Sequence, residues 1–378
     1  LEPTGLKKLV RDIRNIEESI GHSARYMTRG EYNNRVALGK SLVAESPISS
    51  GETISRERVT AKSPAKGISP QYLYDVVGSQ AERDIEEDQL IHWEDVREDD
   101  YRTYNTDLDN WGVVVRFSDI TEHDWGDPDA YEFRINGADM EADIASVLEG
   151  RSINKQLGIH APEQKGHDIV DLSARTEQTR REAVEIIQEV IDIVRDVVKP
   201  HFDIDHNPYI VIHPGGITVD HMELEATEEM NAALERSISD LDDDGVNLLL
   251  ENMPPLPWIY GGQQYHNNFM NANEIAAYCE RTGQRICYDT SHAKLWCNYA
   301  NANLYEHAKK LLPYTEYLHV ADAAGVDGEG LQIGGGEIDF ERIAPVFEGF
   351  DGPVVTEIWR GHERRGEGFK KAAERLSD

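Results

Sequence analysis

After residue 110 the sequence alternates between short apolar runs and segments with helical spacing, and this rhythm constrains the fold most. Eight runs have the length and composition of buried strands: 111–117, 130–135, 155–160, 209–213, 246–251, 284–289, 315–320 and 353–358. Strands that alternate with helices form parallel βαβ units, so we predict an α/β fold, a closed (β/α)₈ TIM barrel. The alternative, an open doubly wound sheet, usually has a glycine-rich turn after its first strand, and residues 116–126 (RFSDITEHDWG) have none.

Six consecutive runs carry an imidazole or a carboxylate near their ends: His160, His213, Glu251, Asp289 (followed by His292), His319 and Glu357. In a barrel the carboxyl ends of all strands meet at one face, where the active sites of this fold lie. Taken singly, each residue has an ordinary structural explanation, such as a hydrogen-bonded histidine or a helix cap. Taken together, they predict one shared bowl.

Carboxylates gathered in such a bowl need a counter-charge, and the sequence offers few bases there, chiefly Lys294 and Arg360. A divalent cation is the simplest solution, because His, Asp and Glu are its usual ligands. The spacing in YDTSHAKL (288–295) fits this hypothesis. Asp289 would ligate from the strand end, and His292 would face the open coordination side.

Residues 111–378 resemble the xylose-isomerase-like, or sugar phosphate isomerase/epimerase, superfamily of metal-dependent barrels. The matching pieces are GIHAPE, VIHPGG, LLLEN, YDTSHAKL, LHVADA and VVTEIW, in that order. The resemblance implies one divalent ion (Mn²⁺, Mg²⁺ or Zn²⁺) held by Glu251, Asp289, His319 and Glu357. It also implies that Glu251 and Glu357 are catalytic and move protons on opposite sides of a sugar or sugar phosphate, while His292 holds a substrate oxygen. Proton abstraction beside a carbonyl needs such a base and a nearby positive centre.

The endonuclease IV nucleases, relatives of this superfamily, suggest a rival function as a metal-dependent phosphodiesterase. They bind three zinc ions and use the equivalents of His160, His213 and His292, all present here. They also need an Asp-x-His pair after the seventh strand. This chain has GVDGEGLQIGGGEIDF there, in which Asp327 and Glu329 occur without the histidine. A third hypothesis is a non-catalytic scaffold whose metal is structural.

Several residues around the bowl are candidates for binding substrate: His292, His160, His213, Lys294, Arg360 and Trp258. Trp258 and Tyr260 belong to a long loop, 254–266, where they could stack on a sugar ring or simply pack. The glycines at 334–336 could cradle a phosphate, although Asp339 capping the next helix explains such a turn equally well.

The amino-terminal region has a different texture, with short β-rich pieces and turn signals. Residues 22–93 resemble the antifreeze-like (SAF) domain of sialic acid (N-acetylneuraminate) synthases, and residues 1–21 are similar to the last helix of the synthase barrel. Residues 94–110, charged and without periodicity, are expected to be a linker. The resemblance implies a fusion in which a synthase barrel precedes this chain, so the chain itself should not condense phosphoenolpyruvate with an amino sugar. Ser63 stands where the family usually offers an arginine.

The chain of 378 residues has 71 acidic and 38 basic residues, a formal net charge of −33. We interpret the acids, which are spread along the whole sequence, as a solvated coat typical of halophilic proteins. Such a charge argues against nucleic acid as a partner, and no apolar run is long enough for a membrane span. The three cysteines have no metal-finger spacing, so we expect reduced thiols in a cytoplasmic protein. We also expect a homo-oligomer that acts on a sugar or amino sugar.

Overall fold

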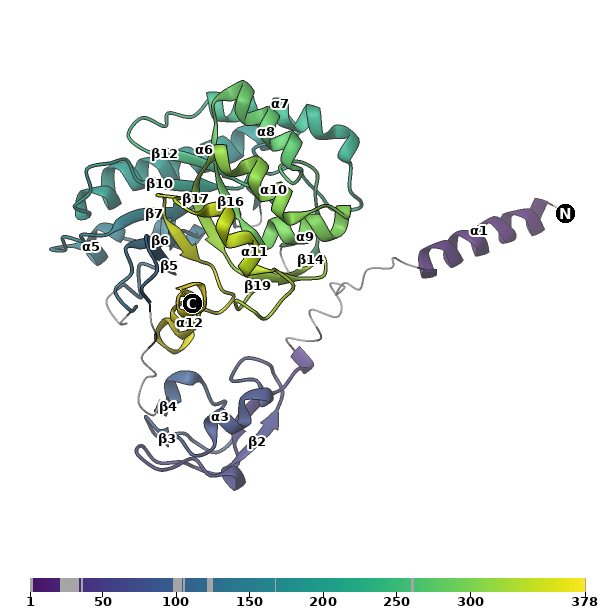
Figure 1. Ribbon diagram of the computed structural model, residues 1–378. Coiled ribbons are helices and arrows are strands. Elements are labelled where there is room, and N and C mark those ends of the chain that lie inside the picture. Colours follow the sequence, from purple (N-terminus) through teal and green to yellow (C-terminus); the bar gives the residue numbers. More distant parts are fainter. Residues whose placement is uncertain are drawn as a thin grey trace.

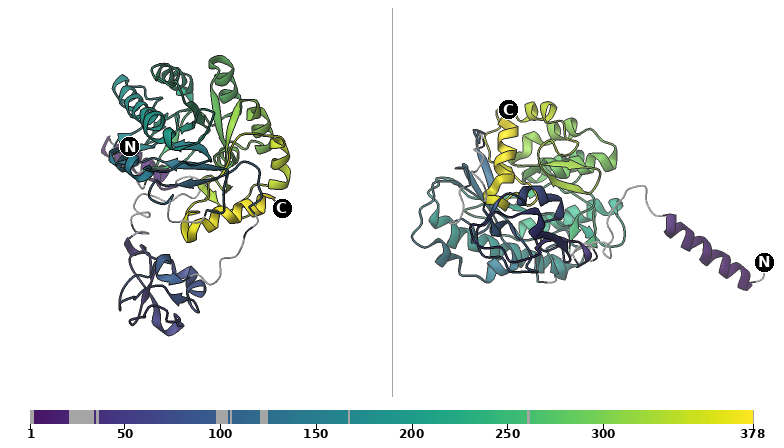
Figure 2. Two further views of the ribbon diagram at one scale, coloured as in Figure 1. Left: turned by 90° about the vertical axis from the view of Figure 1, so that its left-hand side faces the viewer. Right: turned by 90° about the horizontal axis from the view of Figure 1, so that it is seen from below.

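The computed structural model describes residues 3–20, 34, 37–97, 104, 106–120, 125–166, 168–259 and 262–377. Figure 1 shows three parts along the chain: the single helix α1 (Pro3–Ile20), a small β-rich domain and a large barrel. In the right-hand view of Figure 2, α1 stands away from the rest. No helix among the described residues is long and apolar enough to cross a membrane.

Eight parallel strands close into the barrel, in chain order around the ring. They are β5 (Trp111–Val115), β6 (Ala130–Arg134), β7 (Gln156–His160), β10 (Tyr209–Ile212), β12 (Asn247–Glu251), β16 (Arg285–Asp289), β17 (Thr315–Val320) and β20 (Val354–Thr356). Each coincides with one predicted run, and β20 pairs with β5 to complete the closure. The predicted TIM barrel is therefore confirmed, and the open-sheet alternative is excluded.

Helices surround this barrel (Figure 1). They are α4 (Gly137–Glu141), α5 (Ile144–Leu148), α6 (Glu177–Ile193), α7 (Thr227–Ser239), α8 (Ala272–Thr282), α9 (Thr290–Ala300), α10 (Leu304–Leu311), α11 (Phe340–Ile343) and α12 (Glu363–Ser377). The clearest of them, α6, buries Ala183, Ile187 and Val190, which repeat at helical spacing. Their burial against the strands forms the main hydrophobic core.

Short antiparallel strand pairs follow the carboxyl ends of several barrel strands and build a rim around that face. The paired strands are β8 (Gln164–Lys165) with β9 (Asp168–Ile169), β11 (Ile217–Thr218) with β15 (Tyr265–His266), β13 (Trp258–Ile259) with β14 (Gly262–Gln263), and β18 (Asp322–Ala324) with β19 (Gly328–Leu331). The loops that follow the barrel strands thus surround the mouth of the barrel.

The interior of the barrel is layered, because side chains two residues apart on a strand point the same way. One layer is apolar and contains Val211, Leu249, Cys287, Tyr317 and Val355. Two residues further along the same five strands stand His213, Glu251, Asp289, His319 and Glu357. A packed apolar floor therefore supports the polar side chains at the mouth.

The small domain has its own core of buried residues, separate from that of the barrel. Its elements are β1 (Ser41–Ala44), β2 (Val59–Lys62), α3 (Leu73–Val76), β3 (Gln80–Ala81) and β4 (Val96–Arg97). The first residues of the expected linker belong to this domain, since Asp95 is buried and β4 pairs with β3. Ser63 donates a hydrogen bond from its hydroxyl to the Leu38 carbonyl at 2.9 Å.

Candidate active site

The four residues expected to hold a metal lie together at the carboxyl ends of β12, β16, β17 and β20. Potential ligand atoms of Glu251, Asp289, His319 and Glu357 all lie within 4.8 Å of one another. His319 Nδ1 is 2.9 Å from Glu251 Oε1 and 2.8 Å from Glu357 Oε2. We call this set the quartet. Its three carboxylates and one imidazole are a donor set that divalent cations prefer.

Charges in the quartet are mutually dependent. Burial opposes the ionisation of Glu251, but His319 holds the pKa of this carboxyl well below its usual range. Burial raises the pKa of Asp289. Although burial disfavours a charged imidazole, the acidic groups of Cys287, Glu132 and Glu251 hold the pKa of His319 well above its usual range. Glu357 Oε2 is buried, and its close contact with His319 Nδ1 does not have the geometry of a hydrogen bond. A cation among these oxygens would supply the charge that they lack.

The Asp289–His292 spacing has a local explanation as well. Strand β16 runs directly into α9, and the Asp289 carboxylate caps this helix by accepting the His292 N–H at 2.6 Å. The cap fixes the carboxylate at the barrel mouth. His292 Nδ1 lies 3.0 Å from the Asn252 carbonyl, which accepts its proton, so Nε2 points onward and lies 3.9 Å from the Glu329 carboxylate.

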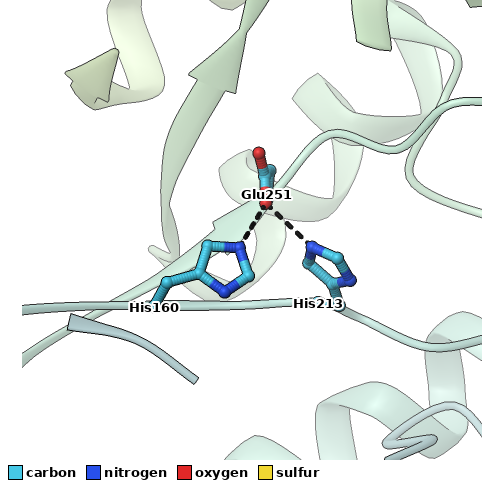
Figure 3. Close-up of side chains that lie close together, drawn as sticks. All are labelled: His160, His213 and Glu251. Carbon is cyan, nitrogen blue, oxygen red and sulfur yellow. Dashed lines mark hydrogen bonds and ion pairs between the residues drawn. The ribbon is translucent and has the colours of Figure 1, made fainter. Parts of the chain in front are cut away.

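A second group, shown in Figure 3, shares Glu251 with the quartet. His160 Nε2 lies 3.3 Å and His213 Nε2 3.0 Å from Glu251 Oε2. The His160 Nδ1 proton is donated to the Ala161 carbonyl at 2.9 Å, and burial lowers the pKa of His160. A neutral ring then turns the lone pair of Nε2 toward a carboxylate oxygen, an arrangement that a cation between them would stabilise.

A cavity of about 300 Å³ opens above the quartet. Asp289, Glu357, His292 and His213 line it, whereas Glu251 and His319 lie fully buried beneath it. Such a volume is at the lower end for small-molecule sites. The cavity thus offers space for a small molecule directly over the quartet.

The other residues predicted to bind substrate differ in whether they line the cavity. Arg360 lines the cavity and forms an ion pair with Glu363. Lys294 does not line it, because its ammonium is turned toward the Glu337 carboxylate, 3.8 Å away. The backbone of Trp258 lies in β13, but its side chain, like all of Tyr260, lies outside the described residues.

The glycine-rich loop does not offer its N–H groups to an external phosphate. Gly334 and Gly336 donate backbone N–H bonds to Asp322 Oδ2 at 3.0 and 2.8 Å. A Cβ at Gly336 would collide with the same carboxylate. The Asp322 carboxylate therefore occupies the anion-binding position of this loop. Asp339 caps α11, as the alternative explanation of the glycine-rich turn predicted.

Three cavity or core residues were missed by reading the sequence. Arg134 forms an ion pair with Glu357, and both Arg134 and Arg116 line the cavity. Glu132, two residues before Arg134 on β6, is completely buried and lies 2.7 Å from His319 Nε2. Inward alternation along 111–117 and 130–135 was the signal, since Arg116, Glu132 and Arg134 occupy inward positions among apolar neighbours.

Comparison with known proteins agrees with this architecture. Residues 113–378 match the family described as xylose isomerase-like TIM barrel, and residues 39–97 match the SAF domain. The chain belongs to the xylose isomerase-like TIM barrel family. Both resemblances seen in the sequence are thereby confirmed. A solved D-tagatose 3-epimerase-like protein aligns with TM-score 0.50 and 20% identity, covering 71% of this chain and 98% of that one. This likeness shows the fold alone.

Curated relatives match the two parts separately. N,N′-diacetyllegionaminic acid synthase of Campylobacter jejuni is 37% identical over 91 residues, which are 24% of this chain and 27% of the synthase. N-acetylneuraminate-9-phosphate synthase of Mus musculus is 33% identical over 97 residues, 25% of this chain and 27% of that enzyme. The chain thus spans about a quarter of these synthases. An uncharacterized protein of Methanocaldococcus jannaschii is 25% identical over 245 residues, 63% of this chain and 76% of its own length.

Proposed function

We propose that the barrel is a divalent-metal-dependent isomerase or epimerase of a sugar or sugar phosphate. The observation that carries the proposal is the quartet of Glu251, Asp289, His319 and Glu357 beneath a cavity at the carboxyl face of the barrel. One Mn²⁺, Mg²⁺ or Zn²⁺ ion bound there would polarise a carbonyl and stabilise the negative charge that develops on its oxygen.

The protein's own groups would manage the proton. Glu357, which lines the cavity and pairs with Arg134, would accept a proton from the carbon beside the carbonyl. Glu251, the other glutamate of the quartet, would return a proton to the same carbon. His292, with its Nδ1 fixed by Asn252, would hold a substrate oxygen through Nε2.

For the substrate we propose an acylamino sugar that precedes a nonulosonic acid. This step rests on association, because the SAF region resembles enzymes named as synthases of such acids. Among epimerase-like structures, the one with D-tagatose in its name points to ketoses as a second class to assay.

A nuclease-like site remains the second candidate, because the His160–His213–Glu251 group offers a further set of metal ligands (Figure 3). Glu329 lines the cavity near His292, in the region where the nuclease pattern needs an Asp-x-His pair. The formal charge of −33 opposes binding of DNA.

The deciding experiment is elemental analysis of wild type and Glu251→Gln, followed by turnover assays of amino sugars and ketoses in D₂O. We expect one Mn, Mg or Zn per wild-type chain, none in the variant, and deuterium entering the carbon beside the carbonyl. Glu274→Gln is the matched control, since Glu274 is a carboxylate on α8 that accepts a hydrogen bond from Asn231 at 2.7 Å. About three zinc ions per chain, with cleavage of abasic DNA, would favour the nuclease. If the protein binds no metal after reconstitution, only the hypothesis of a non-catalytic scaffold remains.

A further inference from the structure

The most unusual charged group in the barrel is Glu132, which the proposed chemistry does not use. It lies on β6 with 0% exposure, at an inward position beside Gly158 of β7. A carboxylate so deeply buried is costly unless it is paired. Its Oε2 is hydrogen-bonded to His319, whose Nε2 lies 2.7 Å away, while Oε1 has no partner among the residues that the structure describes.

This contact fixes which nitrogen of His319 faces the quartet. A carboxylate without its proton can only accept, so Nε2 must carry the hydrogen of the 2.7 Å bond. The opposite nitrogen, Nδ1, is the one beside Glu251 and Glu357, at 2.9 and 2.8 Å. The ring is therefore held between an internal carboxylate on one side and the candidate metal ligands on the other.

We propose that Glu132 is a positioning residue for the divalent cation: it holds His319 with Nδ1 directed at the metal position. Carboxylates that accept the distal N–H of a metal-binding histidine fix its tautomer and orientation and raise its basicity. The inference rests on the metal site of the proposed function but not on its sugar chemistry. Glu132 itself would touch neither the cation nor the substrate.

The test compares Glu132→Gln with the control Glu274→Gln, both of which neutralise a hydrogen-bonded carboxylate without changing its shape. Each metal-free protein is titrated with Mn²⁺ and Zn²⁺ by calorimetry, and its thermal unfolding is recorded without metal. Co²⁺ is also bound, because its visible spectrum reports the ligand field. We expect Glu132→Gln to weaken metal binding about 10- to 100-fold and to shift the Co²⁺ spectrum. Glu274→Gln should change neither.

Two results would overturn the inference. One is a folded Glu132→Gln whose metal affinity lies within twofold of wild type, which would make Glu132 a purely structural partner of His319. The other is a wild-type protein that binds no divalent metal, which would end the proposed function too. Metal binding without sugar turnover would remove only the proposed function. If Glu132→Gln does not fold, Glu132→Asp replaces it, and the same direction with a smaller loss is expected.

Discussion

Two buried aspartates near neighbouring strand ends of the same barrel have opposite surroundings. Asp322, at the start of β18, receives four backbone N–H bonds, from Ala323 and Ile338 to Oδ1 and from Gly334 and Gly336 to Oδ2. Asp289, at the end of β16, accepts one backbone N–H, from His292. Both are 2% exposed or less, so burial alone does not separate them.

The hydrogen-bond partners of the two carboxylates indicate different roles. Asp322 is fully satisfied by the chain and organises the Gly334–Gly336 loop. Asp289 lies instead within 4.8 Å of ligand atoms from two further carboxylates, and burial raises its pKa. A buried carboxylate that accepts several backbone N–H bonds has a structural role. A buried carboxylate that lies beside other carboxylates is suited to bind a cation.

Neutralising each aspartate in turn should have its largest effect on metal binding. We expect Asp289→Asn to lower the affinity for Mn²⁺ or Zn²⁺ by more than about 100-fold, because a direct ligand loses its charge. Asp322→Asn should leave the affinity of the folded protein nearly unchanged. Calorimetric titration measures both, and equal losses in the two variants would contradict the distinction.

The free energy of unfolding should change in the reverse order, more in Asp322→Asn than in Asp289→Asn. Replacing Asp322 by Asn should cost about 3 kcal/mol, because an amide cannot accept all four N–H bonds and leaves buried donors without partners. Asp289→Asn in the metal-free protein should cost far less, since it relieves carboxylate repulsion. Urea unfolding without metal gives both free energies. A metal-free Asp289→Asn protein destabilised as much as Asp322→Asn would show that Asp289 is structural.

The barrel fold and the position of the quartet at its carboxyl face could be predicted from the sequence, because strand length and helical spacing are local signals. The residues proposed as metal ligands also follow from position, because residues that end parallel strands must meet at one face. The role of the 334–336 glycines could not be predicted, since it depends on Asp322 arriving from another loop. The contact of Lys294 could not be predicted for a similar reason, because it depends on how α9 turns the side chain toward Glu337.

Other residues were accessible but overlooked. Arg116 and Arg134 stand two residues beyond inward-facing Val114 and Glu132, so the alternation of side chains along a strand would have placed them at the barrel mouth. Ion pairing of Arg134 with Glu357 requires the closed ring, in which β5 and β6 come round to β20. A sequence shows that these side chains point inward, but it does not show which one each will meet.

The pH dependence of stability should also differ between metal-free wild type and Asp289→Asn. Because the folded pKa of Asp289 is raised, its protonated form favours folding, and this stability is lost as pH rises through that pKa. Asp289→Asn does not titrate, so its stability relative to metal-free wild type should increase from pH 4 to pH 7. Urea titrations at several pH values measure this difference. A gap between the two proteins that is constant with pH would contradict the raised pKa.

The smallest expected effect concerns salt, which separates surface acids from buried ones. Raising KCl from 0.1 to 1 M shortens the screening length from about 10 to about 3 Å, so repulsion within the acidic coat should weaken. With a net charge of −33, the wild-type melting temperature should rise by several degrees. The loss caused by Asp322→Asn should stay the same at both salt concentrations, because its buried N–H bonds are scarcely screened. Calorimetry of the two proteins in both buffers tests this, and a mutational loss that shrinks with salt would place Asp322 among the solvated charges.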